Sequence, residues 1–328
     1  MKILILSQSE IEQLLPMPEC ITVMEDALSA LARGEMHQPL RMVVHPPQAS
    51  GVIAMMPAYK SGAAAVFGLK AICVFPGNPE IGKDAHQGGV LLFSGDTGEP
   101  LALMNASAIT AIRTAAVSGV ATRALAREDA SDLVIFGAGV QARSHLAAIS
   151  CVRPVKRARV ISRNPDHARK FVVDLQEHFD FPISFVDSAF DAVAGADLIV
   201  TATTSREPVL RLEWIAPGTH INAIGTYSPR AREIDSATMA AASVFVDRHE
   251  SALNEAGDYL IAAQEGAIGP DDIRVELGEV LIGAVAGRTS RDEITLFKSL
   301  GLAVEDLAAA AYLYQKAKQQ NVGASVDF

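Results

Sequence analysis

The most informative part of the chain is Leu133-Val134-Ile135-Phe136-Gly137-Ala138-Gly139-Val140-Gln141-Ala142. Its four leading apolar residues are typical of a fully buried parallel strand. The glycines then fit a strand-to-helix turn, because the first permits the turn and the second lets the backbone approach a pyrophosphate. The following helix would direct N–H groups and a partial positive charge toward the phosphates. The segment therefore predicts a nicotinamide dinucleotide site that includes Gly137, Ala138, Gly139, Val140 and Gln141.

The residues after the next expected strand, 158–161, indicate which nicotinamide cofactor is bound. Ser162, Arg163 and Asn164 follow it, and the first carboxylate comes only at Asp166. A site for NAD usually places Asp or Glu at this point to bind the ribose hydroxyls, whereas an arginine suits a 2′-phosphate. We therefore expect NADP(H) to be preferred over NAD(H). The alternative is that Arg163 is a solvated loop cation and that either cofactor binds.

Composition narrows the class of protein. The chain has 328 residues, 49% of them hydrophobic, and a formal net charge of −10. The length suggests two domains, and the acidic balance argues against nucleic-acid binding, which requires clustered Lys and Arg. With no membrane-spanning apolar run and no signal region, a cytoplasmic protein is expected. The odd number of distant cysteines (Cys20, Cys73, Cys151) is typical of reduced thiols. No metal-binding motif is present.

The first third of the chain predicts a mixed α+β domain. Ser7-x-x-Glu10 is a capping box before a helix, and a second helix is expected over 18–31. Strands are expected over 52–56, ending at Pro57, and over 66–75. A turn-rich segment joins 90–93 to 101–104 in an expected hairpin, and an Ala-rich helix is expected over 109–125.

From Leu133 onward, strands alternate with helices. Six strands are expected, the number in two mononucleotide-binding halves: 133–136, 158–161, 183–186, 198–201, 220–224 and 244–246. Helices are expected over 143–150, 165–178, 188–194 and 305–318. The predicted class is α/β, with a Rossmann domain over 121–304 and a substrate and dimerisation domain over 1–120 and 305–328. Strand ends extend the expected cofactor contacts to Thr201, Ala202, Thr203 and Ile224. Glu255, Asp258 and Glu265 are interpreted as a solvated helical face.

Several segments, in order along most of the chain, resemble the ornithine cyclodeaminase/μ-crystallin family. They are Met56-Pro57-Ala58-Tyr59, Gly68-Leu69-Lys70, Phe75-Pro76-Gly77-Asn78, His86-Gln87-Gly88, Ile109 to Ala116, Gly137 to Ala142 and Ile221 to Gly225. The resemblance implies a homodimer formed through the mixed domain and a 2-imino or 2-amino acid as substrate. It further implies that Arg41, Lys70 and Arg113 hold this acid, and that Thr114 binds the cofactor phosphates.

These residue types suit that chemistry. A carboxylate buried beside a nicotinamide must be neutralised, and an arginine fork with a compact lysine charge can do so. Lys70 interrupts an apolar strand, which indicates burial. Arg41 as a solvated loop residue and Arg113 as an exposed helix cation remain alternatives. Lys70 either delivers a proton, if neighbouring cations lower its pKa, or only binds the carboxylate.

The segment Gly225-Thr226-Tyr227-Ser228-Pro229 departs from the pattern of family members that cyclise ornithine, which carry Asp where this chain has Tyr227. A phenol supplies no negative charge near pH 7 to pair with the distal ammonium of ornithine, so this activity is less expected. Tyr227 is instead a candidate for contacting the substrate ring or donating to the substrate. The alternative is a packed loop tyrosine.

The resulting hypothesis is reduction of a cyclic ketimine acid, 1-pyrroline-2-carboxylate or 1-piperideine-2-carboxylate, to the L-amino acid with NADPH. Such a site must mainly place the C=N carbon over the nicotinamide and bind the carboxylate. Three alternatives stay open: reductive amination of a 2-keto acid, as in an alanine dehydrogenase; ornithine or lysine cyclodeamination; and a non-catalytic protein that binds a ligand with NADPH.

Overall fold

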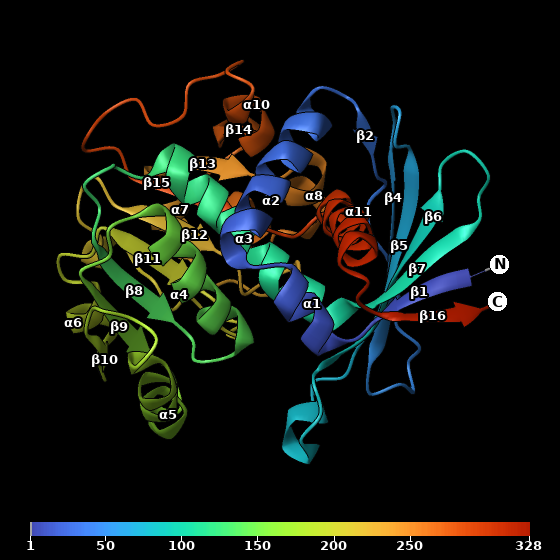
Figure 1. Cartoon of the computed structure of the whole chain (residues 1–328). Helices are drawn as coiled ribbons and strands as arrows, with labels where there is room; N and C mark the ends of the chain where they lie inside the picture. The colour runs from blue at the N-terminus through green and yellow to red at the C-terminus, as the bar shows by residue number, and fades with distance from the viewer. Residues whose placement is uncertain (1) are drawn as a thin grey trace. The chain divides into compact units, whose positions relative to one another are not determined.

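The computed structural model describes residues 2–328, apart from the side chains of residues 79 and 274 (Figure 1). The chain forms two compact units. Unit 1 comprises Met1–Thr114 and Gly301–Phe328, and unit 2 comprises Ala115–Leu300. Within the described residues, the helices include none that is both long and apolar enough to cross a membrane.

Unit 1 is built on a mixed sheet of eight strands. Along the sheet their order is β16 (Ala324–Asp327), β1 (Lys2–Leu6), β7 (Pro100–Asn105), β6 (His86–Ser94), β5 (Val66–Val74), β4 (Val52–Lys60) and β2 (Met36–His37), while β3 (Met42–Val44) also pairs with β4. Among the pairings that the structure describes in this sheet, only that of β1 with β7 is parallel. Pairing of β6 with β7, in which Val90 lies opposite Met104, confirms the expected hairpin.

Helices cover one face of this sheet. Helix α11 (Ala303–Gln320) packs on β4, β5 and β6, and also contacts α2 (Met17–Ala32) and α1 (Gln8–Leu14) (Figure 1). The predicted capping box is present at α1, where Ser7 and Glu10 cap each other. Gly68 of β5 lets α11 approach closely, because a Cβ there would lie 2.7 Å from Leu307. Helix α11 therefore brings the end of the chain onto strands from its first third. A short 3-10 helix, η1 (Asn78–Ile81), follows β5.

Strand β4 continues through Pro57, so the expectation that it ends there is wrong. Proline has no N–H to donate and is tolerated where a strand lacks a partner. On the edge of β4 away from β5, β3 pairs with residues 53–55 and β2 with residues 59–60. Among the described pairings, Pro57 falls between these two partners, where its missing N–H breaks no ladder.

Unit 2 is the predicted Rossmann domain. Its sheet is entirely parallel, in the order β10 (Ile183–Phe185), β9 (Arg157–Ile161), β8 (Asp132–Phe136), β11 (Leu198–Thr201), β12 (His220–Ala223), β15 (Thr295–Lys298), β13 (Ser243–Val246) and β14 (Ile273–Glu276). Strands β14 and β15 were not among the six expected. Both are short, and polar residues stand at or near their ends, so neither shows a continuous apolar run.

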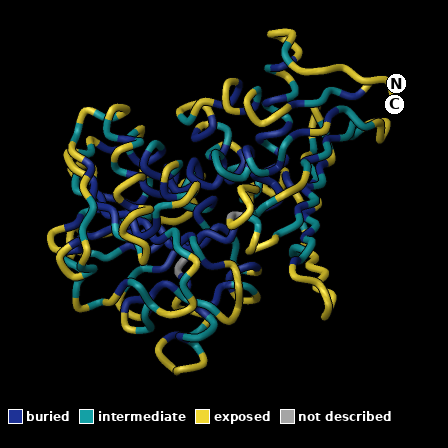
Figure 2. Tube along the Cα trace, turned by 90° about the horizontal axis from the view of Figure 1, so that it is seen from below, coloured by how far each residue is buried: buried dark blue, intermediate teal, exposed yellow. Residues whose placement is uncertain are grey.

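Helices and apolar clusters bury both faces of the unit 2 sheet. Leu133 and Ile135 of β8 belong to one cluster, and the alternating Val134 and Phe136 to the other. This explains the uninterrupted apolar run of that strand. Figure 2 shows buried segments through the middle of unit 2, with exposed turns around them. The helices are α3 (Ala106–Leu125, which starts in unit 1), α4 (Val140–Val152), α5 (Pro165–Gln176), α6 (Ala189–Val193), α7 (Ser236–Ala241), α8 (His249–Glu255), α9 (Gly257–Gln264) and α10 (Leu277–Leu281), with 3-10 turns η2 (Leu212–Trp214) and η3 (Pro270–Asp272).

Candidate active site

Lys70 is the centre of a buried charge cluster in unit 1. It lies on the helix-facing side of β5, where Gly68, Lys70 and Ile72 alternate with less buried residues. Only 3% of Lys70 is exposed, and its Nζ lies 2.6 Å from Oδ2 of Asp306 in the first turn of α11. The burial expected for this lysine is therefore observed.

Arg113 joins the same cluster from helix α3. Its Nε donates to Oδ1 of Asp306 at 3.1 Å, and its Nη1 lies 2.5 Å from Oε2 of Glu305. Arg113 is buried, so it is not the exposed helix cation of the alternative interpretation. Gly301 makes room for it: this residue has φ +78, and a Cβ there would lie 2.6 Å from the guanidinium. At the start of α11, Gly301 thus leaves space for the Arg113 side chain, and Glu305 and Asp306 pair with its charge.

Arg41 completes the group. It is partly buried, and its Nη2 donates to the carbonyl of Gly301 at 3.1 Å. The three cations predicted from separate parts of the sequence therefore gather around the start of α11. Of these three cations, Lys70 and Arg113 pair with two carboxylates, Glu305 and Asp306, and the five groups together sum to one positive charge. One further carboxylate, such as that of a 2-imino acid, would neutralise the group.

Glu305 and Asp306 were not expected among the site residues. Acidic residues in the first turn of a helix ordinarily interact with the helix dipole at the surface, and in the sequence these two stand at the start of an Ala-rich helix. The available signal was their neighbourhood, since Leu302, Ala303, Val304 and Leu307 are all apolar. Both acids are buried to 1% exposure or less.

Electrostatics at the cluster favour a lysine that exchanges protons near neutrality. Burial lowers the pKa of Lys70 to about 8; Arg113 and Arg41 act in the same direction, and Asp306 opposes them. Burial and the charge of Lys70 also lower the pKa of His86 on β6. By contrast, Asp306 and Glu305 outweigh burial at Arg113 and raise the pKa of its guanidinium. Lys70 is thus the member of the cluster able to give up a proton, while Arg113 keeps its charge.

In unit 2, the glycine motif has the geometry of a phosphate-binding turn. Gly137 has φ +116, and a Cβ there would lie 2.4 Å from the carbonyl oxygen of Ala202. A Cβ at Gly139 would meet nothing within 4 Å, so its backbone is open to a ligand. Helix α4 starts at Val140 with no acidic residue in its first turn, and no described side chain caps it. These residues fit the pyrophosphate of a dinucleotide, and Val140 is 61% exposed there.

The tip after β9 is compatible with the predicted 2′-phosphate contact. Arg163 is exposed, and it takes part in none of the hydrogen bonds or ion pairs found among the described residues. Asn164 caps α5, where its Oδ1 accepts from the N–H groups of Asp166 and His167. The hydroxyl of Ser162 accepts from the N–H of Asn164 at 3.3 Å. Arg163 is therefore the residue at this tip with a free charge to offer.

The remaining predicted site residues differ in burial and in their contacts. The Thr201 hydroxyl is buried and donates to Glu233 at 2.9 Å. Ile224 packs in an apolar cluster, and Thr114 is buried in unit 1. Tyr227 is 47% exposed, so it is not packed into the core. Asp258 contradicts its interpretation as a solvated residue: it is fully buried and lies 2.8 Å from Nζ of Lys298.

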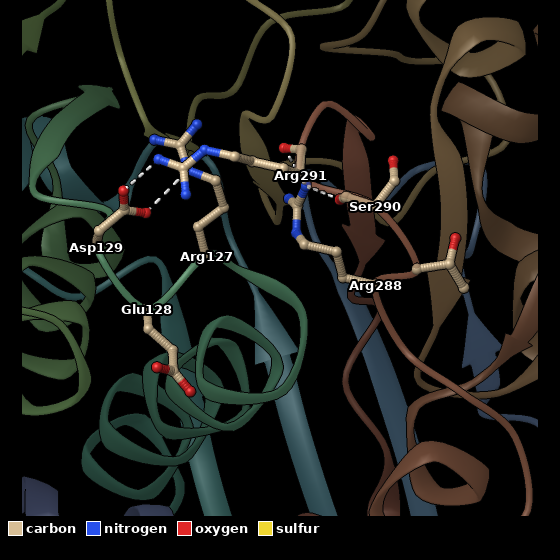
Figure 3. A pocket seen from close by; sticks show the side chains of 7 residues that line it. Arg127, Glu128, Asp129, Arg288, Ser290 and Arg291 are labelled. Atoms are coloured by element: carbon tan, nitrogen blue, oxygen red, sulfur yellow. Dashed lines mark hydrogen bonds and ion pairs between the residues drawn. The ribbon is translucent and has the colours of Figure 1, made fainter.

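Unit 2 also has an open pocket of about 500 Å³, which does not include the glycine motif (Figure 3). It is lined by Arg127, Glu128, Asp129 and residues 288–291, which precede β8 and β15. It therefore lies at the amino edge of the sheet, whereas nucleotides bind at the carboxyl edge. Its arginines are occupied as well: Asp129 pairs with Arg127 and Arg291, and Arg288 donates to backbone carbonyls. We do not assign the nucleotide to this pocket.

The charge balance of unit 1 makes a prediction about stability. Replacing Asp306 by Asn leaves Lys70 and Arg113 buried with one carboxylate fewer, and should lower the free energy of unfolding by about 3 kcal/mol. Denaturant unfolding measures this change. Asp166→Asn, which breaks an exposed pair with Arg169, is the matched control and should change stability by less than about 0.5 kcal/mol. Equal losses in the two variants would contradict the assigned balance.

Comparison with known proteins agrees with this geometry. The family model "Ornithine cyclodeaminase/mu-crystallin family" matches residues 1–321. A Delta(1)-pyrroline-2-carboxylate reductase of Bacillus cereus is 39% identical over 326 residues, which cover 99% of this chain and 100% of that protein.

Two solved structures are similar over the whole chain. The Thermococcus litoralis Delta(1)-pyrroline-2-carboxylate reductase, in complex with NADH and L-proline, has a TM-score of 0.96 and 41% identity, and the match covers 99% of this chain and 100% of that one. An archaeal alanine dehydrogenase dimer with bound NAD has a TM-score of 0.94 and 36% identity, with 100% of both chains covered. The chain belongs to the ornithine cyclodeaminase/mu-crystallin family.

Proposed function

We propose that this protein is an oxidoreductase that reduces a cyclic ketimine acid to the corresponding L-amino acid. The substrate is 1-pyrroline-2-carboxylate or its six-membered homologue, 1-piperideine-2-carboxylate. The observation that carries the proposal is the cluster in which the partly buried Arg41 joins the buried Lys70 and Arg113; these three cations and the carboxylates of Glu305 and Asp306 sum to one positive charge. The relatives named pyrroline-2-carboxylate reductase support the same substrate class.

In this mechanism the cations of unit 1 bind the substrate carboxylate. Arg113 is held rigidly by its two carboxylates and presents its charge in a fixed direction, and Arg41 adds a second guanidinium. A reduced nicotinamide supplies a hydride to the C=N carbon. The site's own contribution is therefore orientation and charge neutralisation rather than covalent chemistry.

Lys70 is the proposed proton source for the imine nitrogen. An imine accepts a hydride readily once it is protonated, and an acid with a pKa near the working pH is suited to this step. The pKa of Lys70, lowered to about 8 by burial, meets that requirement. Tyr227 is the second proposed contact: its phenol would line the ring or donate a hydrogen bond to the substrate.

We also propose that NADPH is preferred over NADH, because Arg163 is exposed at the tip after β9, where the first carboxylate in the sequence comes only at Asp166. The proposed nucleotide contacts further include Thr114, the 137–141 turn, Ser162, Asn164 and the strand ends at 201–203 and 224. Both solved relatives contain the nucleotide without that phosphate, NADH in one and NAD in the other. Since the described cysteines are free thiols, we place this reductase in the reducing cytoplasm.

A homodimer formed through unit 1 is the proposed assembly. The face of its sheet away from α11 carries an apolar groove of about 450 Å³, lined by Ile3, Ile5, Leu91, Phe93, Pro100, Leu103, Val326 and Phe328. Phe328 is 79% exposed and Val326 49%. Apolar residues gathered in this way mark association surfaces. A second copy is the proposed occupant, because the archaeal relative is a dimer over the same length of chain.

The test of function follows nicotinamide absorbance with NADPH and one substrate at a time. We expect turnover of the cyclic imine. If only pyruvate with ammonia is turned over, the activity is that of an alanine dehydrogenase instead. Formation of proline from ornithine would assign cyclodeamination. Arg41→Gln should raise KM for the imine at least about tenfold, because a charge-assisted contact to the carboxylate is lost. Arg33→Gln, which affects an exposed pair with Glu35, is the control.

Cofactor preference is tested at Arg163. Replacing it by Ala should weaken binding of NADPH by at least about tenfold and leave NADH within twofold, because only NADPH carries the 2′-phosphate that a charge-assisted contact would hold. Titration of protein fluorescence with each nucleotide measures both constants. Equal weakening of the two nucleotides would contradict the assignment. Arg169→Ala, another exposed cation of unit 2, provides the comparison.

The assembly is tested at Leu103, a groove residue that is 39% exposed. Leu103→Glu places charges inside an apolar contact, and we expect it to convert a dimer into a folded monomer in sedimentation velocity. Val173→Glu, at a more exposed apolar residue of unit 2, should leave the dimer intact. A dimer that persists unchanged in Leu103→Glu would place the contact elsewhere.

A further inference from the structure

Unit 2 contains a second buried charge group, built around Glu233, a residue that is not among the site residues predicted from the sequence. Glu233 is fully buried. Its Oε2 accepts from the Thr201 hydroxyl at 2.9 Å and from the N–H of Gly225 at 2.7 Å, and its Oε1 accepts from the N–H of Thr203 at 2.7 Å. Three donors thus converge on one carboxylate.

The donors to Glu233 lie at or near the ends of neighbouring strands. Thr201 is the last residue of β11, and Gly225 closely follows the end of β12; the two strands are neighbours, with Thr201 opposite Ala223. Glu233 therefore ties together the carboxyl ends of two adjacent parallel strands. The strand order reverses between β8 and β11, and a dinucleotide binds across the carboxyl edge at such a reversal.

The space around the Glu233 carboxylate is filled. A Cβ on Gly225 would lie 2.5 Å from Oε1 of Glu233 and 2.3 Å from the carbonyl oxygen of Thr203. No larger residue fits between the carboxylate and the strand end. Gly225 is also the first residue of the segment that carries Tyr227, so Glu233 determines where this segment leaves the sheet.

A neighbouring ion pair holds the next residues. Asp258 accepts from the N–H groups of Glu233 and Ile234 at 2.7 and 3.0 Å, and from the Thr226 hydroxyl at 2.8 Å. Lys298, at the end of β15, lies 2.8 Å from Asp258 and donates to the carbonyl of Thr226 at 2.7 Å. Asp258 and Lys298 cancel in charge, which leaves the charge of Glu233 in excess within this group.

The donor set favours the ionised form of Glu233. Burial, the largest effect, and the charge of Asp258 raise the pKa of this carboxyl above its usual range, while its hydrogen bonds and the charge of Lys298 act in the opposite direction. Two of its three donors are backbone N–H groups, which cannot reverse their role. Both oxygens of Glu233 are therefore held as acceptors, which is the arrangement that a carboxylate requires.

A buried negative charge at this edge acts differently on the two redox forms of a nicotinamide, because the oxidised ring is positively charged and the reduced ring is neutral. A net negative charge near the ring stabilises the oxidised form, and so favours release of a hydride from the reduced form.

We propose that Glu233 is a positioning residue for the nicotinamide-binding edge, and that its unbalanced buried charge makes the protein prefer the oxidised over the reduced nicotinamide. The proposal rests on the nucleotide site of the proposed function, and it is independent of which imine or keto acid is reduced. In this proposal Glu233 fixes Gly225, and Asp258 and Lys298 hold Thr226, so the start of the segment that contains Tyr227 is fixed.

Equilibrium binding tests this directly, without turnover. The dissociation constants of NAD⁺, NADH and ADP-ribose, which lacks the nicotinamide, are measured for the wild type and Glu233→Gln. In the variant, one N–H donor must face the new amide N–H₂ group, and the negative charge is gone. We expect ADP-ribose to bind within twofold of the wild type, and the ratio of the NAD⁺ to the NADH constant to rise about fivefold, which corresponds to about 1 kcal/mol.

The chain offers a matched control. Glu293 also accepts from several donors, the Ser243 hydroxyl and the N–H groups of Thr289 and Ser290, but it precedes β15 at the opposite edge of the sheet. Glu293→Gln should leave the ratio unchanged. Lys298→Gln removes a positive charge from the same group as Glu233, and should shift the ratio in the opposite direction; it serves as the second test if Glu233→Gln does not fold.

The outcomes separate the explanations. An equal loss of affinity for NAD⁺ and NADH in Glu233→Gln would overturn the proposed charge effect, and an equal loss for ADP-ribose would show that the residue only maintains the fold. Because wild-type binding of ADP-ribose reports the nucleotide site by itself, failure of the proposed imine reduction would be recognised separately from failure of this inference.

Discussion

Burial of Lys70 and Arg113 against two carboxylates is the interaction on which unit 1 depends. Lys70 and Arg113 are almost inaccessible, and each would be costly to bury alone. Asp306 contacts both, and Glu305 contacts Arg113. These acids stand in the first turn of α11, where the helix dipole also favours negative charge. The C-terminal helix must therefore return to the N-terminal unit, which explains why unit 2 lies between two parts of unit 1 in the sequence.

The same physical idea recurs in unit 2 with the opposite sign. There Lys298 pairs with Asp258, while Glu233 is held by neutral donors, so the group carries one negative charge when Glu233 is ionised. In unit 1 the excess is positive and would attract a carboxylate. Under the two proposals, the positive sum in unit 1 would bind an acid anion, and the negative sum in unit 2 would favour an oxidised nicotinamide.

Much of the fold could be predicted because its signals are local. The apolar run and glycines at 133–142 specify a strand, a turn and a helix, and Gly137 does have the left-handed backbone that this turn requires. The burial of Lys70 was predictable because a lysine inside an apolar strand has apolar neighbours on both sides in the sequence. Strand β4 runs through Pro57 because of a gap between neighbouring strands, which no local pattern records.

The missed residues are those whose role depends on distant partners. Glu305, Asp306, Glu233 and Asp258 are acids on or near helices, and their sequence patterns equally suit a solvated surface. Their burial follows from cations and donors contributed by other elements. Lys298 belongs to β15, a four-residue strand that was itself not predicted. Charge compensation across the chain is therefore what sequence reasoning about single segments could not supply.

Proton uptake on binding of a carboxylate is the measurement that tests the central claim most directly. Cyclopentanecarboxylate has a ring and a carboxylate but no titratable nitrogen. Calorimetry in buffers of different ionisation enthalpy reports how many protons the protein takes up when this ligand binds. An anion beside Lys70, whose pKa burial lowers to about 8, should raise that pKa and cause uptake at pH 8.5 but not at pH 6.5. Lys70→Gln should abolish it. Binding with no proton uptake at pH 8.5 would contradict the account, because the excess positive charge would then not be the site of the acid.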